Sequence, residues 1–394
     1  MYTPESERIP CVIMRGGTSK AVFLLNNDLP ADPEVRDRVI LSIFGSPDSR
    51  QIDGLGGADP LTSKVAIIAP SDNKDADVDY TFGQVDIKTP YVDYSSNCGN
   101  ISSAVGPFAI QQGLVRAAEP ITKVRIYNTN TGKIFEAEVP VKDGRPCVKG
   151  DYKVDGAPGT GARIGLNMAG TIGAKTGSLL PTGRPKDEIE VKGFGRLTVS
   201  MVDAGSPMVF VRAGDLGLKG TESPAEIDGN PRMLELLEEI RTTAAVMMGI
   251  APDRETARRK IRAVPMVAFI SPPQSYKSHI DGTPVSAGDV DFLSRDMFMQ
   301  IMHKTYSGTA TVCTGCAAVT PGTVVHEAMG RDVTRGPVRI GHPGGVIECD
   351  MTVEGGVIVK AAYGRTARRI MEGYVYVPRD ILDEIPVHEI EKEK

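Results

Sequence analysis

Short apolar runs separated by polar turns make up the beginning of the chain. Residues 9–14 and 21–25 are such runs, and a Gly-Gly pair lies between them at positions 16 and 17. Paired glycines supply the positive φ angles that a hairpin tip requires. The same rhythm returns at residues 65–68 and 78–82, which predicts antiparallel strands that begin with a β-hairpin. Further strands are predicted at residues 124–127, 134–139, 189–202 and 208–211.

Other segments carry the start and stop signals of amphipathic helices. Asp32 as N-cap, Pro33 in the first turn and Gly45 just past the end bracket the first. The second begins at Asn230 and closes at Gly249, and its apolar residues recur three and four positions apart, as on one helix face. A third helix is predicted after Asp289, from the spacing of Phe292, Leu293, Phe298, Ile301 and Met302.

Cys98 opens one more segment with helical spacing. Ile101, Val105 and Phe108 share one face of this segment, and Gly113 closes it. Cys98 is therefore predicted at a helix N-terminus.

A later segment enters a predicted helix in a similar way. Ser307, Gly308 and Thr309 repeat the order that Cys98 begins, which is a small nucleophilic side chain, a glycine and a polar residue. Two similar domains could face each other across a cleft in this way. The repeated stretch is short enough to arise by chance.

Length and composition indicate a globular protein of two domains. A chain of 394 residues exceeds the size at which one hydrophobic core usually keeps growing. Apolar residues make up 41% and charged residues 24% of the chain, and its 43 glycines and 28 prolines suit short strands joined by turns. A strand-rich architecture follows.

Charge and cysteine content narrow the partners and the compartment. The formal net charge is −5 with both signs interspersed, so nucleic acid is not expected as a partner. An anionic substrate would need a few locally placed cations. The chain starts without the basic and apolar stretches of a secretion signal and has no apolar run of membrane-spanning length, which predicts a cytoplasmic protein without a membrane association. The six cysteines are irregularly spaced, so free thiols are expected.

Cys98 has the strongest case for chemistry. The N–H groups and the dipole of a helix start stabilise a thiolate. Asn97, Gly99 and Asn100 around it allow the backbone to approach a ligand closely. The structural alternative is a small buried side chain, which fits an average cysteine better. The polar, glycine-flanked setting favours function for this one.

Lys64 and the hairpin tip are the other candidates. Lys64 follows a glycine-rich stretch and leads into an apolar strand, where a cleft could hold it as a base. The spacing alone fits an exposed strand-end lysine better, so the case for Lys64 rests on the resemblance described below. Arg15, Ser19 and Lys20 could bind a carboxylate together with turn amides. A solvated hairpin tip explains these three residues equally well. His342 lies in another tight, glycine-rich turn, and Arg365, Arg368 and Arg369 supply further positive charge. Surface structure explains either feature equally well.

Signals for metal sites and common cofactors are missing. Cys313 and Cys316 form a CxxC pair without a second Cys or His pair at zinc-site spacing, and we interpret them as packing within a helix. No Walker loop, GxGxxG, HExxH or GxSxG motif occurs in the sequence. We expect neither a metal ion nor a cofactor.

Eight short motifs, in order along nearly the whole chain, resemble those of the PrpF family. They are residues 14–20 (MRGGTSK), 45–48 (GSPD), 51–54 (QIDG), 61–64 (LTSK), 97–100 (NCGN), 203–205 (DAG), 341–343 (GHP) and 365–369 (RTARR). The resemblance implies a cofactor-independent isomerase or tautomerase. Such an enzyme would shift a proton, by allylic or cis-trans isomerisation, on a small unsaturated di- or tricarboxylate such as 2-methylaconitate, aconitate or 4-oxalomesaconate.

The resemblance also implies the architecture. It predicts an α+β, diaminopimelate-epimerase-like fold of two similar domains, each a curled mixed β-sheet around a central helix, with the active site between them. The expected domains are residues 1–188, which hold Lys64 and Cys98, and residues 189–375. Residues 376–394 are expected to form a C-terminal segment that packs back on the first domain. A homodimer is the expected oligomer.

By the same resemblance, Lys64 and Cys98 match the proton-handling residues of the family. We favour Lys64 as the base and Cys98 as the acid or an orienting group, and their order stays open. The substrate-binding residues are expected in the hairpin tip, beside the two proton-handling residues, at the second helix start and in the later glycine-rich turn. They are Arg15, Thr18, Ser19, Lys20, Ser63, Asn97, Gly99, Asn100, Ser307, Gly308, Thr309 and His342.

Ser307 marks a departure from the related epimerases. Those enzymes use one cysteine per domain; Cys98 matches the first, and Ser307 stands where the second would be. A serine hydroxyl is too weak an acid for that task, so a two-base racemase or epimerase is the disfavoured alternative. A non-catalytic anion-binding protein is the alternative from another class. The presence of both Lys64 and Cys98 argues against it.

Overall fold

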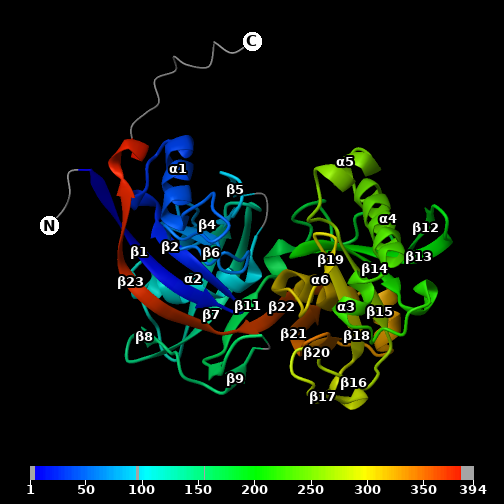
Figure 1. Cartoon of the computed structure of the whole chain (residues 1–394). Helices are drawn as coiled ribbons and strands as arrows, with labels where there is room; N and C mark the ends of the chain where they lie inside the picture. Colours follow the sequence, from blue (N-terminus) through cyan, green and yellow to red (C-terminus); the bar gives the residue numbers. More distant parts are fainter. Residues whose placement is uncertain (1–4, 95–96, 155, 383–394) are drawn as a thin grey trace, which may run out of the picture.

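The computed structural model describes residues 5–94, 97–154 and 156–382, which form an α+β fold (Figure 1). Within these residues one mixed sheet contains 19 strands, and two further sheets contain 2 strands each. Two buried helices, α2 (Gly99–Gln111) and α6 (Gly308–Ala318), pack against different parts of the large sheet. The predicted fold class is confirmed.

The first part of the large sheet curls around α2. β1 (Ser6–Gly16) and β2 (Ser19–Leu25) form the predicted hairpin, and β2 pairs in parallel with β3 (Lys64–Pro70). The sheet continues through β4 (Val78–Val85), β6 (Ile121–Asn128), β7 (Lys133–Lys142) and β11 (Ile164–Asn167), while β23 (Ala367–Pro378) pairs with β1 on the other side. The short strands are β5 (Val92–Asp93), β8 (Arg145–Pro146), β9 (Tyr152–Lys153) and β10 (Thr160–Gly161).

The second part of the sheet curls around α6. β22 (Val357–Arg365) pairs with β11 and so joins the two parts. From β22 the order runs through β21 (Gly345–Glu354), β20 (Arg335–His342), β18 (Phe292–Phe298), β15 (Met266–Ser271), β14 (Ser206–Arg212), β13 (Gly195–Ala204) and β12 (Asp187–Val191). The short strands are β16 (Tyr276–Lys277), β17 (Pro284–Val285) and β19 (Ile301–Met302).

Outer helices cover the faces of the sheet that point away from α2 and α6. β3 shows why: Ala66 packs in the core that contains α2, whereas Val65 and Ile67 pack against α1 (Pro33–Phe44), because strand side chains alternate between faces. α4 (Pro231–Met247) covers β14 and β15 of the second part in the same way. The remaining helices are α3 (Pro224–Asp228), α5 (Arg254–Arg259) and α7 (Val324–Met329).

Local signals predicted the helix ends well. The Asp32 carboxylate accepts hydrogen bonds from the backbone N–H groups of Glu34 and Val35, and Gly45 closes α1 with a φ of 68°. Asn230 caps α4 as expected. A side-chain acceptor at the N-cap and a left-handed glycine after the C-terminus each satisfy backbone groups that the helix leaves open.

Two predictions in the second part are wrong. The segment after Asp289 is not a helix: residues 292–298 form β18, which lies between β15 and β20. A strand buried on both faces carries apolar residues at neighbouring positions, and these imitated helical spacing. Residues 189–202 belong to two strands rather than one, because a turn at residues 192–194 separates them. Gly193 in this turn and Gly195 at the start of β13 both have positive φ.

The domain bounds at residues 188 and 375 stay a prediction. β23 pairs with β1 along its length, so residues 367–375 lie in the first part of the sheet. Just beyond β23, the Ile381 carbonyl accepts a hydrogen bond from Arg38 Nε of α1 at 3.4 Å. Residues 383–394 of the predicted C-terminal segment lie outside the described residues. In the described part of the chain, no helix has the length and apolar character needed to cross a membrane.

Candidate active site

The N-termini of α2 and α6 meet between the two parts of the sheet. Cys98 is the N-cap of α2, and Ser307 is the N-cap of α6. A Cβ atom on Gly99 would lie 3.4 Å from the Cα of Gly308. The hydroxyl of Tyr363, on β22, donates to the Gly99 carbonyl at 3.1 Å. Two positive helix ends thus lie side by side, an arrangement that favours an anion.

The thiol of Cys98 is half-buried and does not cap its own helix. The Cys98 backbone N–H donates to Asn97 Oδ1 at 2.7 Å, and the Cys98 side chain makes no capping hydrogen bond. Tyr80 lies nearby: burial raises its pKa well above the usual value, and the adjacent Cys98 adds to the shift. The thiol is therefore positioned at the start of α2.

Lys64 is buried at the first residue of β3. Its Nζ donates to Gln84 Oε1 at 2.5 Å and lies 5.2 Å from the ring centroid of Phe82. The Gln84 amide is itself fixed, because its Nε2 donates to the carbonyls of Pro60 at 3.1 Å and Ser63 at 2.9 Å. The fixed amide oxygen of Gln84 therefore orients the amine of Lys64.

Three asparagines link the surroundings of the two proton-transfer candidates. Asn97, beside the thiol, accepts from Asn128 Nδ2 at 3.4 Å. Asn128 Nδ2 also donates to Asn130 Oδ1 at 3.3 Å, and Asn130 Nδ2 donates to the carbonyl of Phe82 at 2.8 Å. The ring of Phe82 underlies the lysine amine. The thiol and the amine therefore lie at the same end of the first part of the sheet.

The β1–β2 turn closes against the start of α2. Asn100 Nδ2 donates to Thr18 Oγ1 at 3.0 Å. A Cβ atom at Gly16 or Gly17 would clash with Asn100, and Gly17 has a φ of 50°. The two glycines are therefore needed for this close approach.

The other predicted residues of the turn have mixed roles. Arg15 Nη1 donates to the carbonyls of Gly17 at 2.8 Å and Thr366 at 3.1 Å, so one side of its guanidinium holds the turn in place. Burial, followed by the nearby Arg368, lowers the pKa of Arg15. Among the described residues, the buried hydroxyl of Ser19 has no hydrogen-bond partner, and Ser19 does not line the cavity described below.

Several predicted binding residues make structural hydrogen bonds. Ser63 Oγ donates to Gln51 Oε1 at 2.7 Å, and Thr309 Oγ1 accepts from Ser206 Oγ at 2.9 Å. The backbone N–H of Lys20 donates to the Leu61 carbonyl at 2.9 Å. The Ser307 hydroxyl accepts the backbone N–H of Ala310 at 3.0 Å. Ser307 thus acts as a helix cap.

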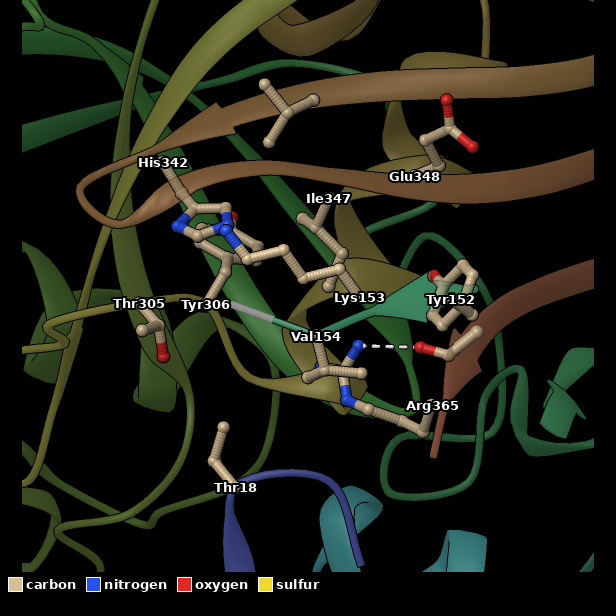
Figure 2. Close-up of a pocket in the computed structure, with 12 residues that line it drawn as sticks. Thr18, Tyr152, Lys153, Val154, Thr305, Tyr306, His342, Ile347, Glu348 and Arg365 are labelled. Atoms are coloured by element: carbon tan, nitrogen blue, oxygen red, sulfur yellow. Dashed lines mark hydrogen bonds between the residues drawn. The ribbon is translucent and has the colours of Figure 1, made fainter. Parts of the chain in front are cut away.

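A cavity of about 200 Å³ lies beside the two helix starts (Figure 2). Of the predicted residues it contains Thr18 and His342, whereas Lys64 and Cys98 are not in its lining. Burial lowers the pKa of His342 well below its usual value, with a contribution from Arg295, so the ring is neutral. The lining residues are Thr18, Tyr152, Lys153, Val154, Thr305, Tyr306, His342, Val346, Ile347, Glu348, Gly364 and Arg365.

Three residues near the site were not predicted as site residues from the sequence. Gln84 and Tyr363 lie in ordinary apolar strands, and only their long-range contacts show what they orient. Arg365 belongs to a basic motif that surface structure explained equally well, yet it is buried and donates through Nε to Asn100 Oδ1 at 3.1 Å. Within the described residues no group of three or more His, Cys, Asp or Glu side chains could hold a metal ion.

Comparison with solved structures defines the class. The crystal structure of methylitaconate-delta-isomerase matches with a TM-score of 0.90 and 54% identity, covering 97% of this chain and 98% of that chain. A hydroxyproline epimerase from Agrobacterium vitis shares the fold with a TM-score of 0.52 and 13% identity, covering 94% of this chain and 93% of that chain. These matches identify the chain as an isomerase with a fold that it shares with a hydroxyproline epimerase.

Sequence comparison gives the family. The PrpF protein family matches residues 6–378. The 3-methylitaconate isomerase of Eubacterium barkeri is 55% identical over 94% of this chain and 98% of its own length. The 2-methyl-aconitate isomerase of Shewanella oneidensis is 40% identical over 95% of this chain and 98% of its own length. The chain belongs to the PrpF family, as its motifs predicted.

Proposed function

We propose that the protein moves the double bond of a small, branched, unsaturated dicarboxylate of the methylitaconate type by an allylic proton shift. The relative that acts on 3-methylitaconate is 55% identical to this chain, and the relative that acts on 2-methyl-aconitate is 40% identical. The site supports an anionic substrate, because two helix starts and a buried arginine lie close together.

The residue roles follow from chemistry and geometry. Lys64, as the free amine, removes the proton from the carbon that is both allylic and next to a carboxylate. The electron pair of that C–H bond forms the new double bond, and the old double bond transfers its pair to the methylene carbon. Cys98 gives its proton to that carbon, which becomes a methyl group. Proton exchange with solvent then restores the amine and the thiol.

One observation carries the proposal: the two helix starts are alike in position and unlike in chemistry. The Cys98 thiol is free of capping, whereas the Ser307 hydroxyl caps α6. A two-thiol racemase needs an acid on each side of its substrate. This site has one thiol and one buried lysine, and both belong to the first part of the sheet, which supports a proton shift between two carbons of one substrate.

Proton NMR of the purified protein in D₂O tests the proposal. With 3-methylitaconate, the vinyl signals should decay and a new methyl signal should grow, carrying one deuterium because the thiol exchanges its proton with solvent. 2-Methylaconitate, aconitate and 4-oxalomesaconate serve as rival substrates, and proline as the racemase control. If the protein converts only one of the rival compounds, that compound is the substrate in place of 3-methylitaconate. If deuterium appears at Cα of proline, the protein is a racemase and the proposed reaction is wrong.

A further inference from the structure

Arg365 is a buried cation whose protein partners are all neutral. It is 4% exposed at the end of β22. Its Nε donates to Asn100 Oδ1 at 3.1 Å, its Nη1 donates to the Gly364 carbonyl at 2.9 Å, and its guanidinium lies 4.7 Å from the ring centroid of Tyr363. These contacts fix the orientation of the guanidinium, and none of them supplies a negative charge.

A buried guanidinium without an anion is costly. Burial lowers the pKa of Arg365 from its usual value, which shows that the surroundings disfavour its charge. Buried charges in proteins are generally paired. A guanidinium has five N–H groups, and the two hydrogen bonds described above use two of them. The remaining donors suit the two oxygens of a carboxylate.

The cavity beside the helix starts offers the space for such a carboxylate. In Figure 2 the Arg365 side chain extends from its strand toward the middle of the lining residues. His342 lines the same cavity, and its Nδ1 accepts the backbone N–H of Gly344 at 3.1 Å. The neutral ring therefore carries its proton on Nε2, as a second donor. A volume of about 200 Å³ lies below the roughly 300–1,000 Å³ of drug-sized sites and suits a small acid.

We propose that Arg365 binds the second carboxylate of the substrate in this cavity and thereby selects dicarboxylates over monocarboxylates. The first carboxylate then lies at the helix starts. Asn100 connects the two places, because it donates to Thr18 and accepts from Arg365 at the start of α2. The identification of the ligand as a dicarboxylate rests on the proposed function.

Calorimetric titration with an unreactive probe tests this role. Methylsuccinate has both carboxylates but no double bond, and each of its two monoamides lacks one negative charge. The wild-type protein should bind methylsuccinate about 10- to 100-fold more tightly than the monoamide whose amide faces Arg365, since hydrogen bonds between charged groups are strong. Arg365→Met should weaken diacid binding by about the same factor and leave the affinity for that monoamide nearly unchanged.

Two more variants control for folding and for general charge. Arg365→Lys keeps the charge but loses the planar fork, so it should show a smaller loss of diacid affinity, with monoamide binding retained. Arg163→Met is the matched control. Like Arg365, Arg163 lies against a tyrosine ring, 5.6 Å from the centroid of Tyr152. Unlike Arg365, it forms an ion pair with Asp350 at 2.8 Å and lies outside the cavity lining. It should keep the wild-type preference. Circular dichroism and thermal unfolding establish that each variant folds.

Three outcomes overturn the inference. The first is that the wild-type protein does not bind methylsuccinate. The second is that both Arg365 variants bind the diacid as tightly as the wild-type protein. The third is that the variants lose the same affinity for the diacid and for both monoamides, which would indicate a purely structural arginine. The probe does not react, so its binding is independent of turnover. Arg365-dependent discrimination in a protein that does not isomerise methylitaconate would overturn the proposed function and leave this site in place.

Discussion

The starts of α2 and α6 occupy equivalent places in the two parts of the sheet, yet they do different work. Both begin with a small polar side chain followed by a glycine, and the two glycines almost touch. Ser307 uses its hydroxyl to cap α6, whereas the Cys98 thiol leaves the first N–H groups of α2 without a side-chain acceptor. One helix start is stabilised, and the other is kept available for a ligand.

Two cysteines within α6, Cys313 and Cys316, also differ from Cys98. Burial raises the pKa values of Cys313 and Cys316 well above the usual range, so both stay protonated. Cys313 Sγ donates to the Val202 carbonyl at 3.3 Å and is part of the core. Under the proposed function, proton transfer therefore belongs to the α2 side, which holds Cys98 and Lys64. Two similar helix ends favour an anion between them, while only the α2 end carries a half-buried thiol.

Removal of the Lys64 side chain gives the strongest test of the difference between the two helix starts. Lys64→Ala should lower kcat by about 10²–10⁴-fold, the usual contribution of a general base, because the alanine methyl group cannot replace the amine that Gln84 orients. The measurement is turnover of 3-methylitaconate by proton NMR. Wild-type kcat in a variant that circular dichroism shows to be folded would contradict the role of Lys64.

Cys98→Ser makes the α2 start chemically similar to the α6 start. We expect kcat to fall by about 10²-fold or more, since a hydroxyl is a much weaker acid than a thiol. A serine at this position can cap the helix, so the free energy of unfolding should stay constant or rise by up to about 1 kcal/mol. Denaturant unfolding and kinetics on the same sample measure both effects. Equal rates for the thiol and the hydroxyl would assign Cys98 a positioning role only.

How far the sequence predicted this arrangement depends on the range of the interactions involved. The hairpin, α1, α4 and the position of Cys98 at a helix start follow from caps, glycines and apolar spacing within a few residues. β18 was misread because its burial on both faces comes from strands distant in sequence. Local patterns carry no information on such pairing.

The candidate site shows the same division. The motifs around Lys64 and Cys98 made both residues candidates, since those motifs are contiguous in the sequence. Arg365 reaches Asn100 across 265 positions of the chain, and Gln84 contacts Lys64 from the neighbouring strand β4. Their roles depend on which neighbour the fold supplies, so the residue types alone did not distinguish them from surface side chains.

Substitutions of Gln84 test the α2 side of the comparison alone, because Gln84 contacts Lys64. Gln84→Leu should lower kcat by about 10-fold, as Lys64 loses the acceptor that orients it. Gln84→Glu places a carboxylate at the same distance and favours the protonated amine. A protonated amine cannot accept a proton, so the rising limb of the pH–rate profile should move to higher pH. A profile identical to that of the wild-type enzyme would show that Gln84 has no part in orienting Lys64.

The smallest kinetic effect is expected on the capped side, and a pair of variants at Ser307 separates capping from anion binding. Ser307→Ala removes the acceptor of the Ala310 N–H and should lower the free energy of unfolding by about 1 kcal/mol, with a minor change in kcat. Ser307→Asp retains a good N-cap, so stability should recover. Its negative charge lies beside the anion site and should raise KM. If both variants instead lower kcat as strongly as Cys98→Ser, the two helix starts are chemically equivalent and the division between them is wrong.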